Sequence, residues 1–158
     1  MSTQLSDIYD ACRTGDVENI KNILNAFPEA VKMQDPKGFS PLMLAVYNGQ
    51  EEVTDYLLKA GADADQPDAS GNTPLMGVCF KGYVSIGKKL IDAGADVNKQ
   101  NFQGATALTF AATFGQVQIA EMLLEKGARK DIKDQRGLSP EAHAKMQGHP
   151  GMVKLFNL

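Results

Sequence analysis

The stretch DASGNTPL, residues 68–75, decides the fold because close variants of it return along the chain at a fixed interval. Its counterparts are DPKGFSPL (35–42), NFQGATAL (101–108) and DQRGLSPE (134–141), so successive copies lie 33 residues apart. Two further glycine series follow the same interval, namely Gly49, Gly82, Gly115 and Gly148, and Gly61, Gly94 and Gly127. Three glycine series in one period predict a repeat protein whose units stack along a single axis.

Each repeated stretch predicts a tight turn followed by a helix. Asp or Asn at the first position and Gly at the fourth are typical of a type I β-turn, which would form the tip of a finger. Ser or Thr is a preferred N-cap residue, and Pro suits the first helical position. We therefore expect first helices to begin after Ser40, Thr73, Thr106 and Ser139 and to end near Gly49, Gly82, Gly115 and Gly148. Second helices should then run to Gly61, Gly94 and Gly127.

The expected second helices carry an apolar stripe. Val53, Leu57 and Leu58 recur at the same helical spacing in the next two units, as Ile86, Leu90 and Ile91 and as Ile119, Leu123 and Leu124. One unit cannot bury such a stripe by itself, so neighbouring units must cover one another.

This pattern resembles the ankyrin repeat, and the resemblance covers essentially the whole chain. It implies an all-α solenoid of stacked helix–turn–helix units with β-turn fingers, forming one domain over residues 1–158. Full units are expected at 35–67, 68–100 and 101–133, with an N-terminal cap at about 3–34 and a C-terminal cap at 134–158. The first unit lacks the finger sequence and has one extra residue before Asp35.

The chain departs from the family pattern at two positions of the first helix. The family usually has His after Thr-Pro-Leu, whereas this chain has Met43, Met76 and Thr109, so we expect apolar packing to replace part of a polar network. The next position has Leu44, Gly77 and Phe110, and we expect Phe110 to fill the space above Gly77.

Composition excludes several classes of partner. The 158 residues (17.0 kDa) carry a net charge of −3, with a pI of about 5.3, so a broad basic surface for nucleic acid or a membrane is not expected. The first residues lack a signal peptide pattern, no apolar run approaches 18 residues, and only two cysteines occur. These features predict a cytoplasmic protein. Charge is uneven, with −6 over residues 1–67 and +3 over 68–158, and solvated helix faces are its simplest explanation.

Several residues resemble motifs for catalysis or cofactor binding, but their positions in the repeat explain them better than such roles do. Gly82–Lys89 resembles a phosphate-binding loop, but the repeat places Gly87 inside a second helix. Cys12 and Cys79 fall two units apart, roughly 16–20 Å, which exceeds the reach of a disulfide and predicts buried, unbridged thiols. His143 and His149 have no metal-ligand spacing, and we expect surface roles for them. We therefore predict no enzyme activity, no catalytic residue, no cofactor and no metal.

The family resemblance implies that function resides on a concave face made of fingers and first helices. Its variable positions carry over to Lys37, Phe39, Tyr47, Asn48, Asn72, Phe80, Lys81, Phe102, Gln103, Thr113, Phe114 and Arg136. Aromatic and cationic side chains on this list are those that protein interfaces favour, although Phe39 and Phe80 could instead seal neighbouring units. We predict a non-enzymatic adaptor or scaffold that binds another protein.

Two alternatives to this function stay open. Val153, Leu155 and Leu158 near the end of the last helix would allow a monomeric protein to associate weakly end to end. A small-molecule, metal or redox role would instead use His143, His149 or the thiols.

Overall fold

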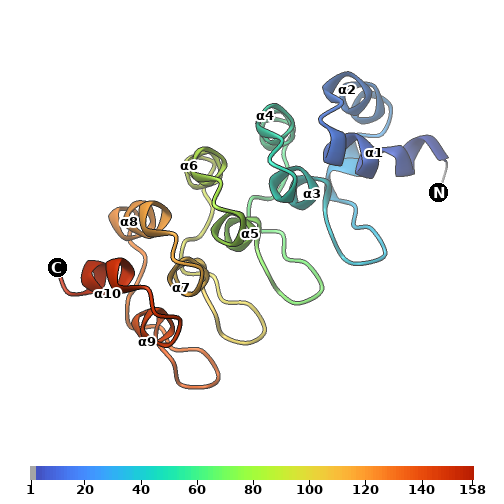
Figure 1. Cartoon of the computed structure of the whole chain (residues 1–158). Coiled ribbons are helices and arrows are strands. Elements are labelled where there is room, and N and C mark those ends of the chain that lie inside the picture. Colours follow the sequence, from blue (N-terminus) through green and yellow to red (C-terminus); the bar gives the residue numbers. More distant parts are fainter. Residues whose placement is uncertain (1–2) are drawn as a thin grey trace.

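The computed structural model describes residues 3–158, in which ten α-helices and one 3-10 helix occur and no strand. In chain order they are α1 (Thr3–Thr14), α2 (Val17–Ala26), η1 (Pro28–Lys32), α3 (Pro41–Tyr47), α4 (Glu51–Lys59), α5 (Pro74–Lys81), α6 (Val84–Asp92), α7 (Ala107–Thr113), α8 (Val117–Glu125), α9 (Pro140–Met146) and α10 (Pro150–Phe156). Figure 1 shows the helices as pairs that step along one axis, odd-numbered helices in one layer and even-numbered helices in the other. The predicted all-α solenoid is confirmed.

The fingers are the loops between successive pairs, and Figure 1 shows them projecting from the side of the odd-numbered helices. In the finger at 68–73, Gly71 N–H donates to the Asp68 carbonyl oxygen at 3.0 Å, and Asp68 Oδ1 accepts from Ser70 N and Asn72 N, both at 2.9 Å. The Asp side chain therefore organises the turn that its backbone opens.

N-cap residues fix where each first helix starts. Ser40 Oγ accepts a hydrogen bond from Met43 N at 3.0 Å, and Thr73, Thr106 and Ser139 make the equivalent bond. These bonds satisfy one of the donors that a helix leaves free at its N-terminus. The predicted starts and ends of the first helices in these units are confirmed.

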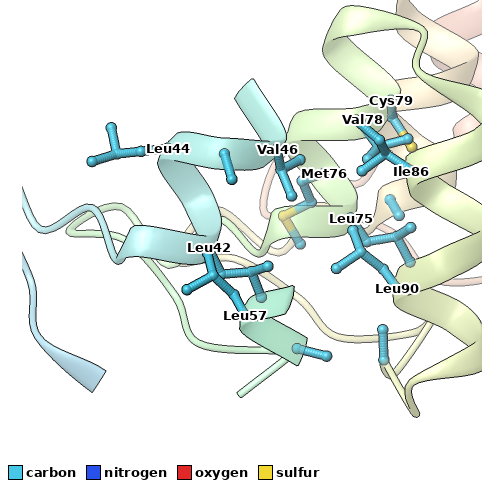
Figure 2. Close-up of a cluster of buried hydrophobic side chains, with 14 of the residues drawn as sticks. Leu42, Leu44, Val46, Leu57, Leu75, Met76, Val78, Cys79, Ile86 and Leu90 are labelled. Carbon is cyan, nitrogen blue, oxygen red and sulfur yellow. The ribbon is translucent and has the colours of Figure 1, made fainter. Parts of the chain in front are cut away.

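The core lies between the two layers of helices. Figure 2 shows Leu42 beside Leu57 and Leu75 beside Leu90, so α3 and α5 each pack a leucine on the second helix of their own unit. The first two residues of the predicted stripe are buried in each unit, and the third, such as Leu58, is half-buried. Gly87 is buried in the middle of α6 against Val78, which excludes an exposed phosphate-binding loop at Gly82–Lys89.

In two of the three units an apolar side chain occupies the position where the family usually has His, as predicted. Met43 and Met76 are buried. Thr109 is also buried but stays polar, because its Oγ1 accepts from Thr106 N at 3.0 Å while its own N–H donates to Thr106 Oγ1 at 3.3 Å. This reciprocal pair satisfies two donors at the start of α7.

The expectation for Gly77 is wrong. A Cβ at Gly77 would lie 2.9 Å from Cε1 of Tyr47, so a ring from the preceding unit fills the space that we assigned to Phe110. Phe39 packs edge-on against Tyr47, with ring centroids 5.8 Å apart, and holds it there. Phe110 instead stacks on Phe114 in its own unit, at 6.4 Å and 25°. Sequence spacing gave no means of choosing between the preceding and the following unit.

The first pair of helices differs from the others in the segment before its finger. Helix α2 ends at Ala26, and η1 occupies the connection to the finger at 35–40, where the sequence has its one extra residue. The N-terminal unit thus reaches the finger by a different path from the units that follow.

Candidate functional site

The candidate site is the finger face, which we define as the four fingers (35–40, 68–73, 101–106 and 134–139) and the exposed sides of α3, α5, α7 and α9. All twelve residues predicted for the concave face lie on these segments or immediately after them. Eight are exposed, namely Lys37, Asn48, Phe80, Lys81, Phe102, Gln103, Phe114 and Arg136, and four are half-buried, namely Phe39, Tyr47, Asn72 and Thr113.

Three phenylalanine side chains are unusually open to solvent. The exposed fractions are 50% for Phe80, 69% for Phe102 and 42% for Phe114. Phe80 on α5 and Phe114 after α7 pack edge to face with centroids 5.0 Å apart, so they join two units. Phe110 stacks on Phe114, and we call Phe80, Phe110 and Phe114 the aromatic cluster. Such a patch has an apolar surface that another protein could cover.

The half-buried members of the predicted site belong mainly to the fold. Tyr47 packs on Gly77, and its burial, with the nearby Asp68 carboxylate, raises the pKa of its hydroxyl. Thr113 Oγ1 donates to the Thr109 carbonyl oxygen at 2.8 Å. Asn72 Oδ1 accepts from Asn101 Nδ2 at 2.9 Å, which links two fingers. These side chains shape the face more than they offer free groups to a partner.

The aromatic cluster separates three open hollows. An upstream hollow of about 400 Å³ lies between Tyr47, Phe80 and Lys81, and a finger hollow of about 480 Å³ lies around Phe102. A downstream hollow of about 490 Å³ lies between Phe114 and Arg136. Phe110 lines all three, which the sequence did not reveal because its repeat position holds Leu44 and Gly77 in the other units.

Neighbouring fingers are joined by hydrogen bonds, so the face has a defined shape. Phe102 N donates to the Ser70 carbonyl oxygen at 3.2 Å, and Gln135 N donates to the Gln103 carbonyl oxygen at 2.9 Å. Gln135 Nε2 also donates to the Phe102 carbonyl oxygen at 2.7 Å. A face ordered in advance loses little conformational entropy when it binds.

The surface roles predicted for the two histidines are corrected by their contacts. His143 Nε2 lies 2.6 Å from Asp134 Oδ2, and its side chain is only 12% exposed. His149 Nε2 lies 3.0 Å from the Thr113 carbonyl oxygen of the preceding unit. His143 therefore joins the last finger to α9, and His149 joins the last unit to the unit before it. Among the residues that the structure describes, no group of three or more His, Cys, Asp or Glu side chains could hold a metal ion.

The Asp134 carboxyl should make the stability of the last unit depend on pH. Burial alone would raise its pKa, but hydrogen bonds from His143, Leu138 N and Arg136 N together lower it below the usual value. A carboxyl whose pKa is lower in the folded state contributes stability at any pH above its unfolded pKa of about 3.9. That contribution to the free energy of unfolding is lost as the pH falls through the folded-state pKa.

We expect Asp134→Asn to reduce the free energy of unfolding by about 1 kcal/mol at neutral pH. Asn is a fair replacement because Asn101 makes the same turn bonds, to Gln103 N and Ala105 N. Urea denaturation of both proteins at neutral pH and near pH 2 provides the measurement. The difference should vanish in acid, and a difference that persists there would show that the charge is not its cause.

The two thiols should be unreactive in the folded protein. Cys12 and Cys79 are both buried and unbridged, as predicted, and burial raises the pKa of Cys12 to about 12 and that of Cys79 further still. Because the thiolate is the reactive form, a chromogenic thiol reagent should label neither cysteine at neutral pH and both after denaturation. Rapid labelling of the native protein would contradict this and favour the redox alternative.

Comparison with known proteins agrees with the geometry. The model of the family described as "Ankyrin repeats (3 copies)" matches residues 8–101 and 75–157. This chain belongs to the ankyrin-repeat family, whose members generally serve as protein–protein interaction modules and are typically non-catalytic.

A curated protein of the fission yeast Schizosaccharomyces pombe, "BTB/POZ domain-containing protein 3", is 36% identical to this chain over 56 residues. The match covers 35% of this chain and 11% of the yeast protein, so it extends over a small part of that relative.

In residues 3–158, no helix combines the length and the apolar character that crossing a membrane requires.

Proposed function

We propose that this protein is a non-enzymatic adaptor that binds another protein through its finger face. The observation that carries the proposal is the exposure of Phe80, Phe102 and Phe114 on one face of two successive units. Aromatic side chains are enriched at the centres of protein interfaces, where covering them releases water from a large apolar area. The hollows on either side of Phe110 offer space for side chains of a partner.

The test compares proteins captured from a lysate of the source organism by the wild type and by Phe80→Ala, Phe102→Ala, Phe114→Ala. We leave Tyr47 unchanged because it packs on Gly77 and its loss would disturb the fold. The matched control changes Glu52, Ser85 and Gln118 to Ala, three exposed residues at one repeated position of the second helices. Melting temperatures of both variants show whether they remain folded.

The proposal predicts a protein captured by the wild type and the control but lost from the finger-face variant. Equal capture by all three would remove the finger face from consideration. Self-association is the alternative, and Leu158 would serve it because its side chain is 89% exposed. An oligomeric fraction that rises with the concentration of the wild type and is absent from Leu158→Ser would favour that alternative.

A further inference from the structure

The charges on the finger face indicate which kind of partner fits it. Lys37, Lys81 and Arg136 are exposed there, and none of them makes an ion pair with residues 3–158. Lys145 on α9, by contrast, is paired with Glu141 at 3.4 Å. These three unpaired cations therefore lie on the same face as the exposed phenylalanines.

The carboxylates of this face are already engaged within the protein. Asp68 Oδ1 accepts two backbone N–H groups of its own finger. Asp134 Oδ1 does the same in the last finger, while its Oδ2 meets His143. Glu141 on α9 turns toward α10, where Asn157 Nδ2 donates to it at 3.2 Å. A partner would therefore meet free positive charge and few free negative groups.

The upstream and downstream hollows each place a cation beside an aromatic side chain. In the upstream hollow, Lys81 Nζ lies 5.8 Å from the ring centroid of Phe80. In the downstream hollow, Arg136 shares the lining with Phe110 and Phe114. A segment that offers a carboxylate next to an aromatic or large aliphatic side chain would complement both groups at once.

The net charge along the chain favours the C-terminal units for such a segment. Residues 1–67 carry −6 and residues 68–158 carry +3, so an acidic segment is repelled at the first end and attracted at the second. The aromatic cluster and the downstream hollow lie in the positive part of the chain, and the upstream hollow lies between that part and Tyr47 and Asn48 of the negative part.

We propose that the finger face over α5, α7 and α9 binds an extended, acidic segment of the partner protein. Its carboxylates pair with Lys81 and Arg136, and an aromatic or large aliphatic side chain packs on the aromatic cluster between them. This proposal rests on the proposed function and adds the chemistry of the partner to it.

Selection from displayed peptide libraries tests the proposal directly. We use three libraries of peptides about 12 residues long, which reach roughly 40 Å when extended. All three contain Leu, Phe, Tyr and Gly. The acidic library adds Asp and Glu, the basic library adds Lys and Arg, and the neutral library adds Ser and Asn. Peptides that each library yields are measured by fluorescence polarisation against the wild type and three variants.

The first variant, Lys81→Glu with Arg136→Glu, reverses the charges of the face. Its matched control, Lys88→Glu with Lys126→Glu, makes the same change in net charge at exposed residues of α6 and at the end of α8. The third variant is Phe80→Ala with Phe114→Ala. All substituted side chains are exposed, and circular dichroism confirms folding.

We expect binders from the acidic library alone. Their affinity should fall roughly tenfold or more in the charge-reversed variant and in the phenylalanine variant, and by less than about twofold in the matched control. Equal losses in the reversed and control variants would overturn the proposal, because net charge rather than position would then govern binding.

The failure of this proposal differs from the failure of the proposed function. Basic or neutral peptides that depend on Phe80 and Phe114 would overturn the acidic partner and keep the finger face as a binding site. Peptides that bind all variants equally would overturn both. No binders from any library would overturn the extended acidic segment, and the capture experiment would then decide on the face itself.

Discussion

Replacing Leu90 with Ala should lower the free energy of unfolding by about 3 kcal/mol, the usual cost of removing a fully buried leucine side chain. Leu90 is buried on α6 beside Leu75, in the middle of the stack, and α6 packs against α4, α5 and α8. The cavity would therefore weaken contacts within its unit and toward both neighbours. The melting temperature should fall by roughly 6–12 °C in a chain of this size.

The matched control for this prediction is Ile91→Ala on the same helix. Ile91 is half-buried, so its truncation should cost about 1 kcal/mol. Chemical denaturation followed by far-ultraviolet circular dichroism gives both values. Equal losses of unfolding free energy would contradict the claim that Leu90 contributes more to the core than Ile91 does.

Replacing Gly71 with Ala should cost about 3 kcal/mol, the second large effect that we expect. Gly71 has φ of +80°, and a Cβ there would lie 2.8 Å from the Phe102 ring and 2.9 Å from its backbone nitrogen. The next finger would have to move. Since Phe102 N donates to the Ser70 carbonyl oxygen, that movement would also break a bond between fingers.

Gly94→Ala is the matched control, because it introduces backbone strain at a positive φ without a steric clash with a neighbouring finger. Gly94 has a similar φ of +96°, but a Cβ there would have no neighbour within 4 Å, so the cost should be about 1 kcal/mol. Thermal denaturation of the two variants measures the difference. Equal destabilisation would show that Phe102 yields freely and that the fingers are less tightly joined than their hydrogen bonds indicate.

Much of the fold follows from local rules that the sequence displays openly. Ser40, Thr73, Thr106 and Ser139 cap helices through bonds within a few residues, and the finger glycines adopt positive φ for local reasons. Repetition then makes each local prediction visible four times. The fold and the buried stripes could be predicted for this reason.

Contacts between units could not be predicted from the sequence by these local rules. Whether Tyr47 or Phe110 fills the space at Gly77 depends on the offset between stacked helices, which spacing within one unit does not contain. The His143–Asp134 pair joins a helix to its finger across nine residues of bent chain. The repeat position of Phe110 indicates a core residue, so the sequence does not predict that Phe110 lines the candidate site.

Covalent footprinting of the complex tests the central claim most directly, once a bound partner or selected peptide is in hand. Radical labelling followed by mass spectrometry reports the accessibility of individual side chains, and the exposed large apolar ones among residues 5–158 are Phe80, Phe102, Phe114, Met146 and Leu158. Binding through the finger face predicts strong protection of Phe80, Phe102 and Phe114 with Leu158 still fully labelled. Protection of Leu158 with unchanged labelling of the three phenylalanines would contradict it.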